Sequence, residues 1–409
     1  QPAALFYYGD EDWLQASGSR SDPWFKPDWN FEQFLCQDYV STACAIPVAR
    51  IPAMGDIFLG EEPKDIIQAV VYATVLAAPS DAVAHVPYVV IHRTVAQYRG
   101  GSAAIRKQLI AHLPTGTSIA EGYAGTRKID WPLPSPPPLV TVIVPTRDRV
   151  VLLRQCIRSL FKTDYPNLEV IVIDNDSQDL EAVGYLKSLE SQNIRVVSYH
   201  GKFNFAAMNN DAAAFASGTM LCFVNNDIDF IDPTWLTEMV RQGARPEVGA
   251  VGAKLLYPDY TIQHAGVAIG LGGAAGHIHK HMNNNSDTHH CEPHVMRAMS
   301  AVTAACLLVS KEKFMEVGGF DAKNFAVAFN DVDLCLNLRA AGYRNIYVPH
   351  AVAIHHESQS RGDDLNPANF ARFRRELSAL QARWKTEGAH DPNWNINFSY
   401  TCEQQTLML

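Results

Sequence analysis

The sequence lacks any long apolar run. Its longest mainly apolar stretches, such as 301–309, fall far short of the ~20 residues that a membrane-spanning helix needs. It also lacks an excess of basic residues, because 34 Lys and Arg against 43 Asp and Glu give a net charge of −9. This charge disfavours nonspecific nucleic-acid binding and provides no polybasic membrane patch. We therefore expect a soluble protein without a nucleic-acid partner, for which peripheral contact with a membrane or with other proteins stays open.

Paired cysteines and a leader segment are also absent. The eight cysteines show no CxxC spacing and have mostly apolar neighbours. That pattern favours reduced core thiols in a cytoplasmic protein over a disulfide framework or a structural zinc site. The chain opens at Gln1 without a methionine or a signal-like stretch, so we interpret it as a trimmed fragment. We expect a cytoplasmic location, with any peripheral association at the inner face of the plasma membrane.

Composition and proline content suggest how the chain is divided. An apolar fraction of 47% and a charged fraction of 19% are ordinary for globular proteins, and 409 residues exceed the usual size of one domain. Prolines are too dense in 131–138 for a helix or a sheet interior, so this segment is predicted to be a semi-rigid linker. The predicted units are a first region over 1–130, the linker, a domain over 139–362, and a C-terminal helix and tail over 363–409.

After the linker, apolar strands and helical patterns alternate. Near-continuous Val and Ile runs separated by helices predict a mostly parallel α/β sheet covered on both faces. Ligands of such sheets bind at the carboxyl ends of the strands, and polar clusters lie there at 146–149, 174–177 and 225–227. From 248 to 290 the pattern loosens into a glycine- and histidine-rich stretch, and a helix is expected from 368 to 384.

The cluster after the strand 219–224 is the most informative. Asn225, Asp227 and Asp229 alternate, so pairs of them can point oxygen atoms at one place. Oxygen ligands suit Mg²⁺ or Mn²⁺. The alternative is a solvated loop that caps the following helix.

The first region repeats part of this pattern. A strand at 4–8 runs into Asp10 and Asp12, and Val86-Pro87 followed by His92 is similar to Val348-Pro349 followed by His355. We interpret the first region as the rear half of a second copy of the later domain.

Several motifs in order identify the second region. They are 142–149, 172–175, 203–205 with Asn209, 224–227, 318–321, 330–334, and His355 with 360–362. Together they resemble the inverting family 2 glycosyltransferases with a GT-A fold, particularly bacterial enzymes of O-antigen, rhamnan and related polysaccharide synthesis. The first region resembles the C-terminal half of a similar domain. It is expected to be inactive as present, because no nucleotide-binding front half precedes it and no acidic base motif stands near 62–65.

The resemblance implies a set of donor-binding residues. Asp174 and Asp176 could instead cap the following helix, Asn204 and Asn209 could bond to the backbone, and Arg361 could be a solvated surface residue. The set comprises Pro145, Thr146, Arg147, Asp148, Asp174, Asn175, Asn204, Asn209, Asn226 and Arg361.

The resemblance also implies a metal site for Mn²⁺ or Mg²⁺. It pairs Asn225 with Asp227, leaves the role of Asp229 open, and adds His355 as a third ligand, with His356 as its substitute. An imidazole suits Mn²⁺ better than Mg²⁺. The alternative for His355 is a polar residue with an ordinary hydrogen bond.

Asp331 is the predicted general base. The family pattern has two acids here, whereas this chain has Asn330 before Asp331, and the alternative is that Asp331 only starts a helix. Asn330, Asp333 and His277 are expected on the acceptor side. His277 also alternates with His279 and His281, which is compatible with zinc, but acceptor contacts or a plain structural role are favoured.

The sequence thus predicts a metal-dependent, inverting transfer of a sugar to a hydroxyl of a surface glycan or lipid-linked acceptor. The resemblance suggests rhamnose from dTDP-rhamnose, with UDP- or GDP-sugars as alternatives. One rival is a noncatalytic glycan-binding or scaffolding module of a polysaccharide-synthesis complex. A nucleotidyltransferase is disfavoured, because 145–149 is not a glycine-rich loop with a lysine.

Overall fold

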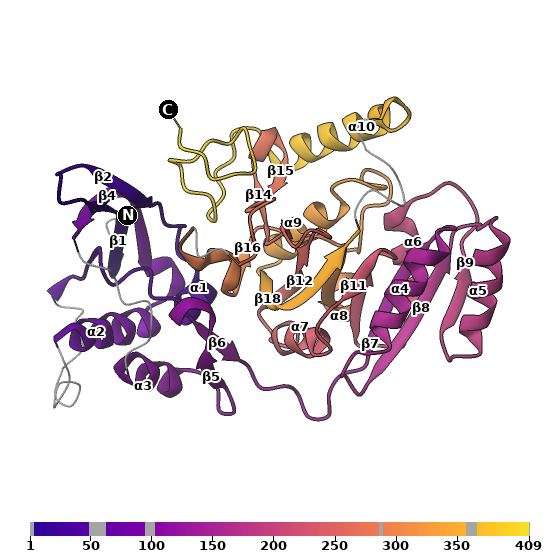
Figure 1. Cartoon of the computed structure of the whole chain (residues 1–409), viewed down its shortest axis with the longest axis horizontal. Helices are drawn as coiled ribbons and strands as arrows, with labels where there is room; N and C mark the ends of the chain where they lie inside the picture. The colour runs from indigo at the N-terminus through magenta and orange to yellow at the C-terminus, as the bar shows by residue number, and fades with distance from the viewer. Residues whose placement is uncertain (1–3, 49–62, 95–102, 286–288, 357–365, 409) are drawn as a thin grey trace.

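The computed structural model describes residues 4–48, 63–94, 103–285, 289–356 and 366–408 (Figure 1). In the second region a ten-stranded sheet is the central feature, and eight of its strands follow the order β11-β18-β12-β17-β10-β7-β8-β9. Two short strands, β13 and β16, extend it beside β12 and β18. The strands are β7 (Val140–Thr146), β8 (Leu168–Asp174), β9 (Arg195–Ser198), β10 (Met220–Val224), β11 (Ile228–Phe230), β12 (Val248–Leu256), β13 (Ile262–His264), β16 (Arg297–Met299), β17 (Cys306–Ser310) and β18 (Arg344–His355).

Most of the eight strands along this path run in one direction. β10, β7, β8 and β9 are parallel neighbours, and so are β12 and β18. β17 is antiparallel to both β10 and β12, which gives these two groups a common direction. β11 is antiparallel to β18. The predicted α/β class with a mostly parallel central sheet is therefore confirmed.

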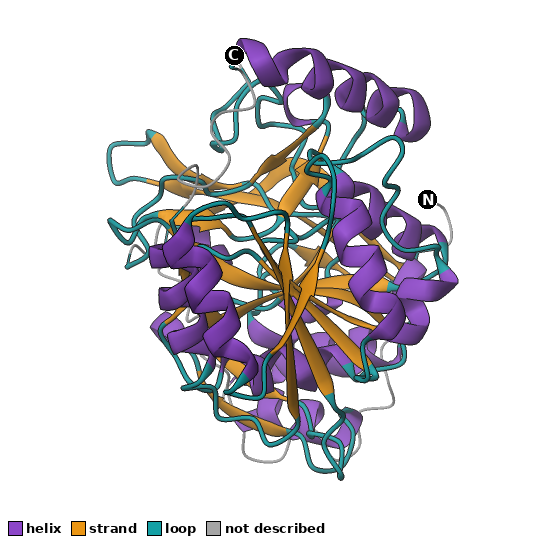
Figure 2. Ribbon diagram, turned by 90° about the vertical axis from the view of Figure 1, so that its right-hand side faces the viewer, coloured by secondary structure: helices purple, strands orange, loops and turns teal. Residues whose placement is uncertain are grey.

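Helices cover both faces of this sheet (Figure 2). Alternate strand residues supply the two faces: Val142 and Val144 join one apolar core with α4, α5 and α7, whereas Ile143 joins the other with α6, α8 and α9. The helices are α4 (Val150–Leu160), α5 (Leu180–Glu190), α6 (Phe205–Phe215), α7 (Trp235–Gly243), α8 (Lys311–Glu316), α9 (Asn330–Ala340) and α10 (Pro367–Trp384).

The expectation that the pattern loosens from residue 248 is wrong for β12. All nine residues of β12 are buried and the strand lies inside the sheet between β17 and β18. Gly249 and Gly252 conceal the strand pattern, but the second is needed for packing: a Cβ at Gly252 would lie 2.5 Å from the Cβ of Val302. The looser segment begins after this strand, with the hairpin of β14 (Val267–Ile269) and β15 (Ala275–His277).

The first region has its own sheet, in which β1 pairs with β2, β3 and β4. The acidic residues Asp10 and Asp12 lie within the long strand β1, next to β4. The elements are β1 (Phe6–Leu14), β2 (Arg20–Trp24), α1 (Phe31–Cys36), β3 (Cys44–Ala45), α2 (Pro63–Ala77), β4 (Val83–Arg93), α3 (Ala103–His112), and the hairpin β5 (Ser118–Glu121) with β6 (Arg127–Asp130).

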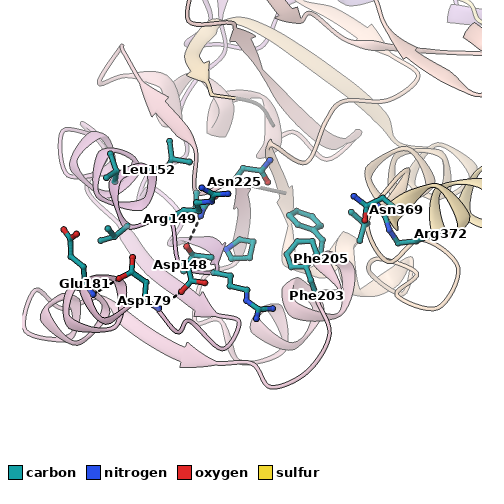
Figure 3. Close-up of a pocket in the computed structure, with 17 residues that line it drawn as sticks. Asp148, Arg149, Leu152, Asp179, Glu181, Phe203, Phe205, Asn225, Asn369 and Arg372 are labelled. Carbon is teal, nitrogen blue, oxygen red and sulfur yellow. Dashed lines mark hydrogen bonds between the residues drawn. The ribbon is translucent and has the colours of Figure 1, made fainter. Parts of the chain in front are cut away.

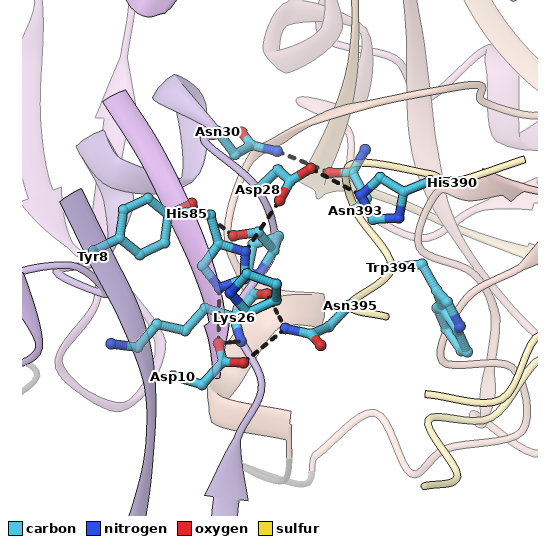
Figure 4. A network of polar contacts seen from close by, with 12 residues as sticks. Tyr8, Asp10, Lys26, Asp28, Asn30, His85, His390, Asn393, Trp394 and Asn395 are labelled. Carbon is cyan, nitrogen blue, oxygen red and sulfur yellow. Dashed lines mark hydrogen bonds and ion pairs between the residues drawn. The ribbon is translucent and has the colours of Figure 1, made fainter. Parts of the chain in front are cut away.

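The C-terminal tail joins the two regions. Asn395 donates hydrogen bonds to Asp10 Oδ2 at 3.1 Å and to the carbonyl oxygen of Lys26 at 2.8 Å, and His390 lies 3.0 Å from Asp28 (Figure 4). A bidentate ion pair of Arg245 with Glu32, with contacts of 2.9 and 3.1 Å, adds a second connection.

Two further predictions concern cysteine and membrane helices. All eight cysteines are free thiols and six of them are buried, as expected. In the described part of the chain, no helix combines the length and the apolar character required to cross a membrane.

Candidate active site

A cleft of about 1100 Å³ opens at the carboxyl ends of β7 and β10, between the start of α4 and the start of α10 (Figure 3). Its position is the one expected for ligands of a mostly parallel sheet. The lining residues are Pro145, Thr146, Arg147, Asp148, Arg149, Val150, Val151, Leu152, Asp179, Glu181, Phe203, Phe205, Asn225, Asn226, Val327, Asn369 and Arg372.

The turn from β7 into α4 forms one wall of the cleft. Asp148 and Arg149 both adopt left-handed backbone conformations, with φ of 53° and 51°. The carboxylate of Asp148 stabilises the turn by accepting the backbone N–H groups of Gln178 at 2.7 Å and Asp179 at 2.9 Å. The bond from Asp179 is the largest of the contributions that lower the pKa of Asp148. Asp148 is thus ionised, and it joins the loops that follow β7 and β8.

The cleft contains cationic side chains from distant parts of the chain. Arg147 and Arg149 are exposed on the β7–α4 turn, and Arg372 reaches the cleft from α10. Guanidinium groups bind phosphate oxygens through paired N–H donors, so this arrangement suits an anionic ligand. Asn226 lies among them and donates to the hydroxyl of Thr146 at 2.8 Å.

Asn225, Asp227 and His355 meet beside the cleft. His355 Nε2 lies 3.1 Å from Asp227 Oδ1 and 3.4 Å from Asn225 Nδ2. His355 Nδ1 lies 2.6 Å from Gln263 Oε1, which can only accept a hydrogen bond. The backbone N–H of His356 donates to the Asp227 carbonyl oxygen at 3.0 Å and fixes the turn against the end of β18.

The side chains of Asn225, Asp227 and His355 are suitable ligands for a divalent cation. Because Gln263 accepts from Nδ1–H, His355 turns its Nε2 toward Asp227 Oδ1, so that a nitrogen ligand and an oxygen ligand face one place. Ligands at right angles around Mn²⁺ or Mg²⁺ lie about 3.0 Å apart, close to the separation observed here. No three His, Cys, Asp or Glu side chains form a metal-sized group in the described residues. A third ligand would be Oδ1 of Asn225, after a rotation of its amide, because Nδ2 faces His355 here.

Asp229 does not join this cluster. Its Oδ2 accepts a 2.8 Å bond from Gln155 of α4, whose amide also lies 3.4 Å from His356 Nε2. Asp227 stands in a turn whereas Asp229 stands in β11, so the two carboxylates do not share the face that uniform alternation would give them.

Asp331 occupies the first turn of α9. Its two carboxylate oxygens accept N–H groups from Ala304 at 3.0 Å and from Val332 at 2.9 Å. The neighbouring Ala305 carbonyl accepts the N–H of Asn225 at 3.0 Å. The segment before β17 therefore connects Asp331 with the cluster around His355.

Several predicted donor residues bond locally and do not line the cleft. Asp174 accepts the Ser177 N–H at 3.0 Å, and Asn204 caps α6 by accepting the Ala207 N–H at 2.9 Å. Asn175 donates to the carbonyl groups of Tyr199 and Gly201, and buried Asn209 donates to that of Phe205. Arg361 lies outside the described residues.

Asn330, Asp333 and His277, the residues expected on the acceptor side, contact different parts of the structure. Asn330 donates to the Val327 carbonyl at 2.6 Å, and fully buried Asp333 accepts from Arg383 and Trp384 of α10. Both contacts hold the surroundings of Asp331 in place. His277 packs its ring against His264, His279 lies 3.4 Å from Glu292, and His281 stacks on Tyr257. These three histidines therefore face different partners.

Sequence reasoning missed the α10 wall of the cleft. Asn369 and Arg372 stand far from the strand-end motifs, and no periodicity indicates which distant helix covers a cleft. Phe203 and Phe205 belong to the motif at 203–205, but nothing in the sequence indicates that their rings line the cleft. The basic character of α10, with four Arg and one Glu in its span, was the available signal for an anion-binding element.

Known proteins support the identification of the second region. Residues 141–304 match the family model described as Glycosyl transferase family 2. The uncharacterized protein y4gI of Sinorhizobium fredii is 38% identical over 97% of this chain and 45% of its own length. The O-antigen biosynthesis protein RfbC of Myxococcus xanthus is 36% identical over 90% of this chain and 30% of its own length. The N-acetylglucosaminyl-diphospho-decaprenol L-rhamnosyltransferase of Mycobacterium tuberculosis is 41% identical over 17% of this chain and 22% of its own length.

The chain thus spans less than half the length of each of these relatives. The match to the family model runs from β7 to just before β17, and it includes the turn of Asp227 and the walls of the cleft formed by α4 and α6. This part of the chain is therefore a family 2 glycosyltransferase domain.

Proposed function

We propose that this domain is a metal-dependent, inverting glycosyltransferase that acts on a nucleoside-diphosphate sugar. The observation that carries the proposal is the convergence of Asn225, Asp227 and His355 beside a cleft lined with arginine. An acidic and imidazole donor set next to guanidinium groups matches the needs of a diphosphate and its counter-cation.

The donor would bind in the cleft at the strand ends. Arg147, Arg149 and Arg372 would attract the diphosphate, because guanidinium groups pair with phosphate oxygens. Thr146 and Asn226 offer a hydroxyl and an amide to the nucleoside. The remaining predicted donor residues, Pro145, Asp148, Asp174, Asn175, Asn204, Asn209 and Arg361, stay part of this proposal as contacts or as supports of the loops.

Mn²⁺ or Mg²⁺ would be held by Asp227, His355 and Asn225. When bound, the cation would offset the negative charge that grows on the departing diphosphate. Gln263 would keep the imidazole of His355 in the orientation that turns Nε2 toward Asp227. Asp229 would act only through Gln155 and the packing of α4.

Asp331 would be the general base. In an inverting transfer the acceptor hydroxyl displaces the diphosphate in one step, so a single carboxylate must take up the hydroxyl proton. The two N–H donors from Ala304 and Val332 hold the Asp331 carboxylate in place, and its remaining lone pairs can accept that proton. Asn330 would affect this step by holding the backbone just before the base.

The relatives support a role in polysaccharide synthesis. One is named for O-antigen biosynthesis and one for transfer of rhamnose to a lipid-linked saccharide. We therefore propose a surface glycan or lipid-linked sugar as acceptor, and dTDP-rhamnose as the first donor to test, before UDP- and GDP-sugars. We also propose the division into a first region over 1–130, a linker over 131–138, a domain over 139–362, and a C-terminal helix and tail over 363–409.

Calorimetry can test the metal and donor sites without knowledge of the acceptor. UDP, dTDP and GDP would each be titrated into the wild type with and without Mn²⁺, and into Asp227→Ala and Asp229→Asn. We expect one nucleotide to bind with a metal-dependent affinity that Asp227→Ala lowers by about tenfold to a hundredfold. Asp229→Asn should leave it within about twofold, because that carboxylate bonds to Gln155.

Two results would argue against the proposal. Absence of binding by every nucleotide to a folded sample would favour the noncatalytic scaffold. Metal-independent binding that is unaffected by Asp227→Ala would remove the metal site while leaving a nucleotide cleft.

A further inference from the structure

A buried carboxylate connects the donor cleft with the segment that carries the predicted base. Glu376 of α10 is 4% exposed and accepts three hydrogen bonds. The donors are the Val327 N–H at 3.2 Å, the Ala328 N–H at 2.9 Å and Arg372 Nη1 at 2.9 Å. Val327 and Arg372 both line the cleft, so one side chain bridges two of its walls.

The amides bound by Glu376 lie only a few residues before Asp331. The chain turns sharply between them, because Phe329 has a φ of 61°, and Asn330 closes the turn through its 2.6 Å bond to the Val327 carbonyl. Phe329 packs on Phe373 of α10, with ring centroids 5.5 Å apart. The conformation of 327–331 therefore depends on α10.

The other end of α10 holds the same loop. Arg383 bonds to Asp321 at 2.7 Å and to Asp333 at 2.9 Å, and Trp384 donates to Asp333 at 2.7 Å. These contacts hold the residues on either side of 327–331 to the C-terminal end of α10. The contact at Glu376 differs from these because it includes Arg372, one of the cations of the cleft, and thus links the cleft to the amides of Val327 and Ala328.

We propose that Glu376 is a positioning residue that couples donor binding at Arg372 to the order of the segment carrying Asp331. The inference rests on the proposed function, in which the donor diphosphate engages Arg372. A diphosphate that holds the guanidinium restricts the motion of Arg372, and Arg372 in turn restricts the carboxylate that holds the amides of Val327 and Ala328. Binding of the donor would thereby order the base before the acceptor arrives, which is a coupling between two sites.

Hydrogen exchange of the backbone amides tests this coupling directly. The wild type would be compared with and without a saturating amount of the nucleoside diphosphate identified by calorimetry, together with Mn²⁺. We expect exchange of the peptide covering 325–333 to slow by about tenfold or more on binding, since its amides would be released only by local opening. Arg372→Ala, saturated with the same nucleotide, should lose this slowing.

Arg374→Ala is the matched control. Arg374 lies on the exposed side of the same helix, so its loss should leave the slowing intact. Unchanged exchange over 325–333 in the nucleotide-bound wild type would overturn the coupling, and so would equal slowing in Arg372→Ala. If no nucleotide binds at all, both the proposed function and the inference fail. If a nucleotide binds but exchange over 325–333 stays unchanged, only the inference fails.

Kinetics provide a second readout. Glu376→Gln presents an amide in place of a carboxylate that accepts three donors, so it should lower kcat by about tenfold or more while donor KM changes by less than about threefold. Glu376→Asp should restore part of the rate. A Glu376→Gln variant with normal kcat, or one that loses donor affinity and kcat equally, would contradict a positioning role.

Discussion

The two regions of the molecule contain similar groups in different electrostatic settings. In the first region Asp12 of β1 lies 2.5 Å from His92 of β4, and in the second Asp227 lies 3.1 Å from His355 at the end of β18. Both pairs set a carboxylate from an alternating acidic motif against a histidine that follows a Val-Pro pair. The resemblance noted in the sequence therefore extends to side-chain contacts.

The difference lies in what surrounds each pair. Asp12 is also bonded to Arg20 at 2.7 Å, and the adjacent Glu11 lies 3.7 Å from Lys26 and 3.5 Å from Arg93. The cluster of Asp227 is instead supported by uncharged amides, those of Asn225 and Gln263. In the first region the protein supplies positive charge to its acidic strand, whereas the second offers a donor set that suits an external cation. Nearby charges, more than the motif itself, decide between these outcomes.

The largest expected effect concerns a group for which we find no counterpart in the described part of the first region. Asp331→Asn should lower kcat by about a thousandfold, because the acceptor hydroxyl loses the carboxylate that takes up its proton. Nucleotide affinity should change little. The measurement is release of nucleoside diphosphate from the donor in the presence of a lipid-linked saccharide acceptor.

Asp211→Asn is the control for this prediction, since Asp211 is exposed on α6 of the same region. Equal rates for Asp331→Asn and the wild type would show that another group accepts the proton.

The buried ion pair of the first region should contribute strongly to stability. Lys26 and Glu11 are both fully buried, so Lys26→Met leaves a carboxylate in an apolar setting and should cost about 3 kcal/mol of unfolding free energy. Urea unfolding followed by tryptophan fluorescence would measure the loss. Lys107→Met, at an exposed position of α3, should have almost no effect. A stable Lys26→Met protein would mean that Arg93 suffices to stabilise Glu11.

Paired substitutions compare the two carboxylates directly. Asp227→Ala should lower the metal-dependent affinity for nucleotide by about tenfold to a hundredfold, as argued above. Asp12→Ala should leave that affinity within about twofold, because its partners are Arg20 and His92 of the first region. Calorimetry in Mn²⁺ would measure both. A comparable loss in Asp12→Ala would show that the first region contributes to nucleotide binding.

Much of the second region could be predicted because its signals are local. The strands that end in Thr146, Asp174 and Val224 are near-continuous apolar runs, and each is followed by polar residues that mark the binding edge. The meeting of Asp227 with His355 was predicted from the resemblance, and the structure brings the two side chains together. The role of Asp229 stayed open, because the turn at Asp227 breaks the strand alternation and periodicity cannot reveal such a break.

Contacts across long sequence separations could not be predicted. Glu376 bonds to backbone N–H groups 48 and 49 positions earlier, and backbone groups carry no residue-specific signal. Likewise, Gly249 and Gly252 made β12 look irregular, although a glycine is what allows Val302 to pack against the strand. Both features depend on tertiary packing rather than on local pattern.

The smallest expected effect is a difference in pH dependence between buried histidines of the two regions. Burial alone would lower the pKa of His85, but its hydrogen bonds to Asp10 and Asp28 outweigh this and raise the pKa above 6.5 (Figure 4). The pKa of His264 shifts in the opposite direction: burial reduces it to about 3. Among the described residues, its ring bonds to two backbone groups, the Ala253 carbonyl and the Thr303 N–H.

The signs follow from linkage between proton binding and folding. The stabilisation from His85 is complete below about pH 6.5 and is lost as the pH rises through the raised pKa, because the folded state then releases its extra proton. For His264 the unfolded state binds the extra proton, so stability is lost as the pH falls below about 6.5. Urea unfolding between about pH 6 and 8 should therefore show that the stability advantage of the wild type over His85→Gln shrinks as the pH rises, while its advantage over His264→Gln grows. Slopes of the same sign for both variants would mean that Asp10 and Asp28 do not hold His85 in its charged form, and the electrostatic contrast between the two regions would fail at this site.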